Sequence, residues 1–164
     1  MFASEELISA LNTQIGNEMQ ASLQYTSIAC YLDTETLPEL AGVFYDQADE
    51  ERAHAMRFAR FIVDVGGRVR IPALEAPVSD FESAEACVEL SLAGETAVTE
   101  QVNDLVILAS SESTHVALRF LDYFVVEQLE EVNKMASLLT LIRRAGSAGL
   151  HFVEDYLSRK KAST

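Results

Sequence analysis

Six polar side chains occupy positions where the helical pattern around them predicts hydrophobic residues. They are four glutamates, one histidine and one glutamine: Glu18, Glu51, His54, Glu95, Gln128 and Glu131. Glu51 and His54 are three residues apart, as are Gln128 and Glu131, so each pair would lie on one face of a helix. Buried carboxylates repel one another unless they take up protons or bind cations. Two divalent ions would balance the four negative charges, and a carboxylate-rich set with one imidazole suits iron or manganese.

The alternative interpretation of these residues is structural. A single glutamate on an apolar stripe is more often a side chain that reaches out to water than a metal ligand. One Glu-x-x-His spacing is also a weak signal. The coincidence of six such residues near the middle of four separate stripes favours a metal site in the interior of a helical bundle.

The elements that would position these residues are long amphipathic helices. Apolar residues recur every three or four positions, which predicts helices over about 4–33, 38–65, 81–110 and 114–145. Glycines and prolines gather between residues 66 and 77, where we expect a crossover that runs the length of a bundle. A fifth helix over about 150–158 is too short to be stable alone and must dock on a partner. The sequence predicts an all-α four-helix bundle with one long crossover and a short C-terminal fifth helix, in a single domain over 1–164.

Charge and hydropathy exclude several classes of function. The formal charge of −14 argues against nucleic-acid binding, which needs an excess of Lys and Arg. Such a charge suits a protein that attracts cations, although taken alone it is better explained by solubility. The sequence has no run of 18 apolar residues and no basic leader followed by an apolar run. We therefore expect a cytoplasmic protein that does not bind membranes.

The remaining cysteines and histidines give no sign of chemistry. Cys30 and Cys87 lack a Cys-x-x-Cys spacing, so we predict that they are small, reduced core residues. His115 and His151 lie near a helix start and in the C-terminal segment, and we expect ordinary surface residues at both positions.

The residues around the six polar positions resemble those of the ferritin family over almost the whole chain. The matching segments are Asn17-Glu18 with Tyr25, Glu50-Glu51-Arg-Ala-His54, Glu95 with Thr99-Glu100-Gln101, and Glu127-Gln128-Leu-Glu130-Glu131. Bacterioferritins and rubrerythrins have a second Glu-x-x-His in the last segment, whereas Gln128 and Glu131 stand here, as in non-haem bacterial ferritins. Bacterioferritins also place a haem-ligating Met directly after the second helix's glutamate. This chain has Arg52 there, so the resemblance does not imply haem.

The resemblance implies a dinuclear ferroxidase centre of non-haem iron. Glu18, Glu51 and His54 would hold one iron, and Glu51 would bridge to a second iron held also by Glu95 and Glu131, with Gln128 close by. Tyr25 corresponds to the tyrosine beside that centre, where it would supply an electron or a hydrogen bond. Without the resemblance, Tyr25 would be interpreted as a core tyrosine that needs a hydrogen-bond partner.

The resemblance also implies a third, weaker iron site on the side that faces the mineral cavity. Its residues would be Glu50, Glu127 and Glu130. A solvated acidic helix face explains these three residues about as well.

The activity implied by the resemblance is oxidation of Fe(II) by O2 or H2O2, with storage of the ferric mineral inside a hollow shell of 24 subunits. The fifth helix would dock around the four-fold axes of that shell. One alternative is a di-iron or di-manganese oxidase or peroxidase of the same fold that stores no metal. Another is a helical scaffold, for which Fe(II) would oxidise no faster than in buffer.

Overall fold

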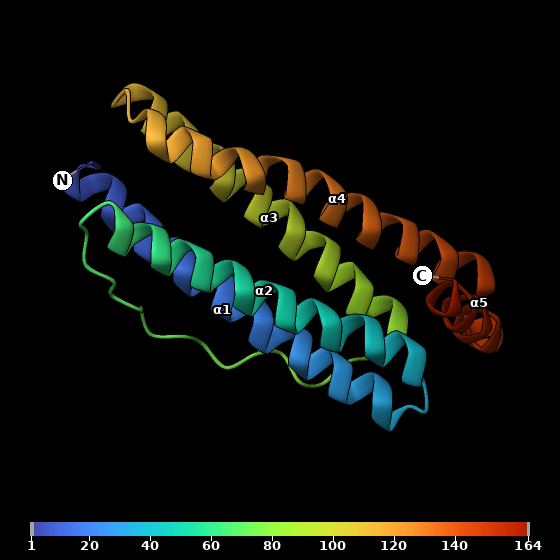
Figure 1. Cartoon of the computed structure of the whole chain (residues 1–164). Helices are drawn as coiled ribbons and strands as arrows, with labels where there is room; N and C mark the ends of the chain where they lie inside the picture. The colour runs from blue at the N-terminus through green and yellow to red at the C-terminus, as the bar shows by residue number, and fades with distance from the viewer. Residues whose placement is uncertain (1, 164) are drawn as a thin grey trace.

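The computed structural model describes residues 2–163, so the two end residues of the expected domain lie outside it. Its long helices are α1 (Glu5–Thr34), α2 (Pro38–Asp64), α3 (Ala84–Ser111) and α4 (His115–Ala145). A short 3-10 helix, η1 (Ser147–Gly149), leads into α5 (Leu150–Ala162). Helix α1 packs along α2, α3 packs along α4, and α5 crosses one end of the bundle against α2 and α4 (Figure 1). The described residues contain no β-strand, and the predicted all-α four-helix bundle is confirmed.

Two helix boundaries differ from the sequence prediction. Helix α3 begins at Ala84 instead of near residue 81, because the Ser83 hydroxyl accepts a hydrogen bond from the Ala86 amide at 3.1 Å and caps the helix there. Helix α5 continues to Ala162 instead of ending near residue 158. Its last turn contains three basic residues, which the helix dipole favours at that end. The other boundaries lie within one residue of the expected positions.

The N-terminus of α2 is capped from the far end of the chain. Leu37, which precedes the helix, offers no capping side chain. Instead the Glu154 carboxylate of α5 accepts hydrogen bonds from the backbone amides of Glu39 and Leu40, both at 2.8 Å. One carboxylate thereby satisfies two of the free amides of α2 and fixes α5 against the bundle.

Amide side chains of α1 hold the crossover in place. The Asn12 side chain forms hydrogen bonds with the backbone of Arg68 and Arg70. The Gln20 side chain forms hydrogen bonds with the backbone of Glu75. The Gln24 side chain does the same with the backbone of Val78. Gly16 allows the closest approach, because a Cβ atom there would lie 2.3 Å from the Pro72 ring. The crossover therefore follows the length of α1 (Figure 1).

The apolar interior forms two separate clusters. The first cluster includes Leu11, Phe58 and Phe124, and the second includes Leu32, Phe44 and Met135. On each long helix the residues of the two clusters are separated by a stretch that contains a buried polar side chain. This arrangement leaves a polar layer halfway along the bundle, where all four long helices contribute.

The minor sequence predictions have mixed outcomes. Cys87 is buried as predicted, but the prediction of a core position for Cys30 is wrong because that residue is exposed. Cys30 follows the buried Ala29 by one position, and one residue turns a helix by about 100°. His115 and His151 are exposed, as predicted. None of the described helices is long and apolar enough to cross a membrane.

Candidate metal centre

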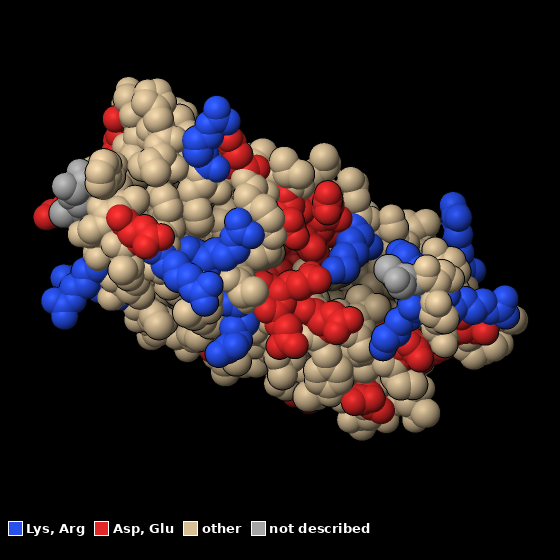
Figure 2. Space-filling view, viewed as in Figure 1, with Lys and Arg blue, Asp and Glu red and all other residues tan. Residues whose placement is uncertain are grey.

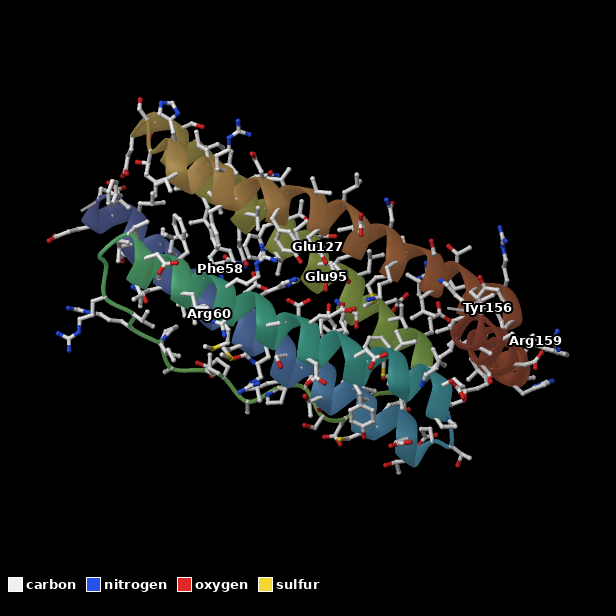
Figure 3. All side chains as sticks on the ribbon, viewed as in Figure 1. Phe58, Arg60, Glu95, Glu127, Tyr156 and Arg159 are labelled. Carbon is white, nitrogen blue, oxygen red and sulfur yellow. The ribbon has the colours of Figure 1, made fainter. Side chains whose placement is uncertain are left out.

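The polar layer is built around the six residues singled out by their type and spacing. Each of them is at most 4% exposed: Glu18, Glu51, His54, Glu95, Gln128 and Glu131. Glu95 on α3 lies midway along the bundle, with Phe58 of the first apolar cluster to one side (Figure 3). The helices bring these side chains together because each polar position falls on the stripe that faces the other helices.

Glu18 of α1 and the pair Glu51 and His54 of α2 form the tightest group. Each offers one ligand atom, and the three atoms lie within 4.8 Å of one another. The Gln14 amide donates to Glu18 Oε1 at 2.8 Å, whereas Glu18 Oε2 is buried with no hydrogen-bond partner among the described residues. A buried carboxylate oxygen without a donor is unfavourable. This group of three therefore requires a proton or a cation.

The pKa values of this group show where positive charge is needed. Burial raises the pKa of Glu18 well above its usual value, and the Glu51 carboxylate beside it raises that pKa further. Burial acts to raise the pKa of Glu51 as well, but the hydrogen bond with His54 and the proximity of Glu18 outweigh burial and lower it. Burial acts to lower the pKa of His54, but the contact with Glu51 raises it. Glu18 and His54 therefore tend to be protonated, and a bound divalent ion could replace the two protons.

Glu95 of α3 lies between a phenol and an amide. The Tyr25 hydroxyl donates to Glu95 Oε1 in a short hydrogen bond, and Gln128 Nε2 lies 3.2 Å from Glu95 Oε2. Burial raises the pKa of Glu95 to about 7, with a further contribution from the charge of Glu51. Burial and the Glu95 charge raise the pKa of Tyr25, so the phenol remains a hydrogen-bond donor at neutral pH. The two donors fix the orientation of the Glu95 carboxylate.

Glu131 of α4 is linked to Glu51 through a buried amide. Gln47 Nε2 lies 2.6 Å from Glu131 Oε2 and 3.1 Å from Glu51 Oε1. The Lys134 ammonium lies 3.6 Å from Glu131 Oε2. Burial raises the pKa of Glu131, while the charge of Lys134 acts to lower it. Glu131 therefore completes the layer on the α4 side.

The three glutamates matched to a further iron site lie at the edge of the layer. Glu127 is half-buried, with Oε1 3.9 Å from His54 Nε2. Glu50 and Glu130 are exposed, and Glu50 Oε2 is 3.3 Å from the Lys134 ammonium. Acidic side chains gather midway along this face, with basic side chains on either side (Figure 2). The structure thus connects Glu127 to the buried layer and leaves Glu130 at the surface.

Three residues of the layer were not recognised from the sequence as part of the site. Gln14 lies four residues before Glu18, Gln47 four residues before Glu51, and Lys134 three residues after Glu131. Each contacts the glutamate that its spacing places on the same helix face. A search for polar residues one turn from each candidate ligand would have found them.

The donor set fits iron. It offers carboxylate oxygens and one imidazole nitrogen in an enclosed layer, and no thiol takes part, since Cys30 is exposed and Cys87 belongs to an apolar cluster. The unpartnered oxygen of Glu18 supports a bound cation independently of the sequence pattern. Fold and site together define a class of four-helix bundles that gather carboxylates and histidine from facing helices in the interior.

Comparisons with known proteins identify the family. A family model described as a ferritin-like domain matches residues 8–145. Ferritin BfrB of Mycolicibacterium smegmatis is 37% identical over 153 residues, covering 93% of this chain and 84% of that protein. A bacterial non-heme ferritin of Staphylococcus aureus is 31% identical over 159 residues, 96% of each chain. An open pore ferritin from the archaeon Archaeoglobus fulgidus has a TM-score of 0.92 at 33% identity, covering 96% of this chain and 97% of that one. The chain belongs to the ferritin family.

Proposed function

We propose that this protein stores iron by oxidising Fe(II) at a dinuclear centre and depositing the ferric product inside a shell of 24 subunits. Membership of the ferritin family supports iron storage. The main support for the oxidation site is the buried layer to which all four long helices contribute carboxylates, with one unpartnered carboxylate oxygen. Iron is the substrate of this reaction and the cargo of the shell.

In this proposal each residue of the layer has a defined role. Glu18, Glu51 and His54 hold one iron, and Glu51 bridges to a second iron held also by Glu95 and Glu131. Gln128 and Tyr25 orient Glu95 through their hydrogen bonds. The donor set needs no haem, and Arg52, which follows the bridging glutamate, is exposed.

The proposed chemistry is a two-electron reduction of the oxidant. Two ferrous ions give one electron each, so one H2O2 with two protons becomes two waters, and one O2 with two protons becomes H2O2. Glu18 and His54 have raised pKa values and tend to be protonated, so they would release protons when the ions bind. Glu50, Glu127 and Glu130 would bind a third ion on the way to the mineral cavity.

Substitution of the bridging glutamate tests the oxidation site. We expect Glu51→Ala to slow the rapid oxidation of Fe(II), followed by ferric absorbance, by at least about 100-fold, because both ions lose a ligand. Asp49→Ala is the matched control, since Asp49 is an exposed carboxylate two residues away on α2. Wild-type protein that oxidises Fe(II) no faster than buffer would contradict the proposed site.

Iron accumulation separates storage from the alternative oxidase or peroxidase. A storage shell would elute near 430 kDa, about 24 times the 18.1 kDa subunit, and would retain many iron atoms for each subunit. A small oligomer that consumes peroxide and retains no iron would support the alternative instead. We further propose that storage takes place in the cytoplasm, a reducing compartment that suits the two free cysteines.

A further inference from the structure

Lys134 inserts a positive charge between the buried layer and the acidic edge. Its ammonium lies 2.5 Å from Gln47 Oε1, 3.3 Å from Glu50 Oε2 and 3.6 Å from Glu131 Oε2. The ammonium donates hydrogen bonds to Gln47 and Glu50 of α2, and it forms an ion pair with Glu131 of α4 at the longer distance. The charge is therefore held at a fixed place, and one of its partners is a proposed iron ligand.

The same ammonium determines how the Gln47 amide is oriented. Gln47 is fully buried, and its Nε2 donates to both Glu51 and Glu131. If the amide were reversed, its NH2 group would face the Lys134 ammonium and its oxygen would face two carboxylates. Lys134 therefore keeps the amide between Glu51 and Glu131 in its observed orientation.

A metal ion bound to Glu131 would place a second cation close to the Lys134 ammonium. They would compete for the lone pairs of Glu131, and two cations at such short range repel each other strongly. The displaced lysine side chain could move into a neighbouring groove. It lines this groove of about 630 Å³ between α2, α4 and α5. The lining includes the acidic Asp46 and Glu130 near Lys134 on α2 and α4, together with the basic Arg144, Lys160 and Lys161.

We propose that Lys134 is a tethered counter-cation of the metal centre, which neutralises Glu131 and orders Gln47 until an incoming metal ion displaces it into the neighbouring groove. This inference rests on the proposed function, because it assumes that Glu131 binds metal. Lys134 would act as a positioning residue that sets the affinity of the Glu131 side for its ion. It would also favour ions of higher charge, which are better able to displace an ammonium.

Redox-inert Co(II) tests this role without catalysis. Full-length protein, treated first with a chelator, is titrated with Co(II) and followed by calorimetry and by the Co(II) absorption bands. We expect Lys134→Met to bind the second Co(II) about tenfold more tightly, while the affinity for the first ion stays within about twofold. Lys134→Arg retains the charge and should resemble the wild type.

Thermal unfolding separates this role from a purely structural one. Lys134→Met should unfold at a lower temperature than the wild type after chelation, because Glu131 and Glu50 lose their counter-charge. After loading with Co(II) the two proteins should unfold at the same temperature. An equal loss of stability in both forms would show a merely structural lysine and overturn the proposal.

Arg143→Met is the matched control. It removes the same charge from the same helix, and Arg143 also pairs with two carboxylates, Glu85 and Glu89. If Arg143→Met tightened Co(II) binding as much as Lys134→Met, the effect would be one of net charge and the proposal would be wrong. A wild type that binds no Co(II) would overturn the metal site as well. Two bound ions with unchanged affinity in Lys134→Met would overturn the role of Lys134 alone.

Discussion

Glu18 and Glu51 face each other in one cluster, yet their surroundings drive their pKa values in opposite directions. Glu51 accepts hydrogen bonds from a histidine and an amide, which stabilise its charge and lower its pKa. Glu18 has one donor, Gln14, and an oxygen with no partner, and its pKa is raised. Glu51 is thus suited to remain a carboxylate that bridges two ions, whereas Glu18 exchanges a proton for a metal.

Protonation of Glu95 should make the stability of the chelator-treated protein depend on pH. Burial raises the pKa of this carboxyl from 4.5 to about 7. Between these pH values the folded state holds more protons than the unfolded state, so the free energy of unfolding falls as pH rises. We expect Glu95 alone to contribute a loss of about 3 kcal/mol across this window. Urea unfolding at a series of pH values measures it.

The neighbours of Glu95 reinforce this trend. Glu18 and Glu131 have raised pKa values and change stability in the same direction. The pKa of His54 is raised above 6.5, so its contribution is lost as pH rises beyond that value. The lowered pKa of Glu51 acts in the opposite direction, but only below pH 4.5. Glu95→Gln should flatten the slope, and an unchanged slope in that variant would show that Glu95 does not titrate in this window.

At the scale of helices, α2 and α5 depend on each other through one carboxylate. Glu154→Ala removes the acceptor of two backbone amides at the start of α2, and we expect a loss of about 1 to 2 kcal/mol in the free energy of unfolding. The amides of Glu39 and Leu40 should exchange hydrogen faster, as measured by mass spectrometry. Asp155→Ala is the control, because among the described residues this exposed neighbour pairs with Arg159 of the same helix. Equal effects of the two substitutions would contradict a specific cap.

The helices were predictable because their periodicity is local, whereas contacts between distant residues were not. Apolar spacing located the long helices to within a few residues, and it placed the six polar residues on inward faces. The Glu154 cap joins residues 115 positions apart, and Asn12 reaches Arg68 across the crossover. No local pattern encodes such pairs. Lys134 was missed for a related reason, since a lysine beside an apolar stripe usually extends into water.

At the scale of the whole molecule, the distribution of apolar surface indicates that this chain has partners. Helix α5 has one fully buried residue, Val153, while its aromatic side chains Phe152 and Tyr156 are 68% and 52% exposed. An exposed aromatic pair on a short helix is unfavourable in water unless another surface covers it. Assembly into the proposed shell would cover such a surface at the subunit contacts.

The size of the assembly should therefore depend on Phe152. If α5 docks against copies of itself, burying this side chain contributes about 2 kcal/mol for each subunit, and a buried carboxylate in its place is strongly unfavourable. We expect Phe152→Glu to shift the protein from the full shell to smaller species in sedimentation velocity at micromolar concentration. Ser158→Glu adds the same charge to an exposed position of α5 and should leave the shell intact. Helical content measured by circular dichroism should be the same in both variants. A Phe152→Glu protein that still sediments as the full shell would show that α5 does not form a subunit contact, and its exposed aromatic residues would then need another partner.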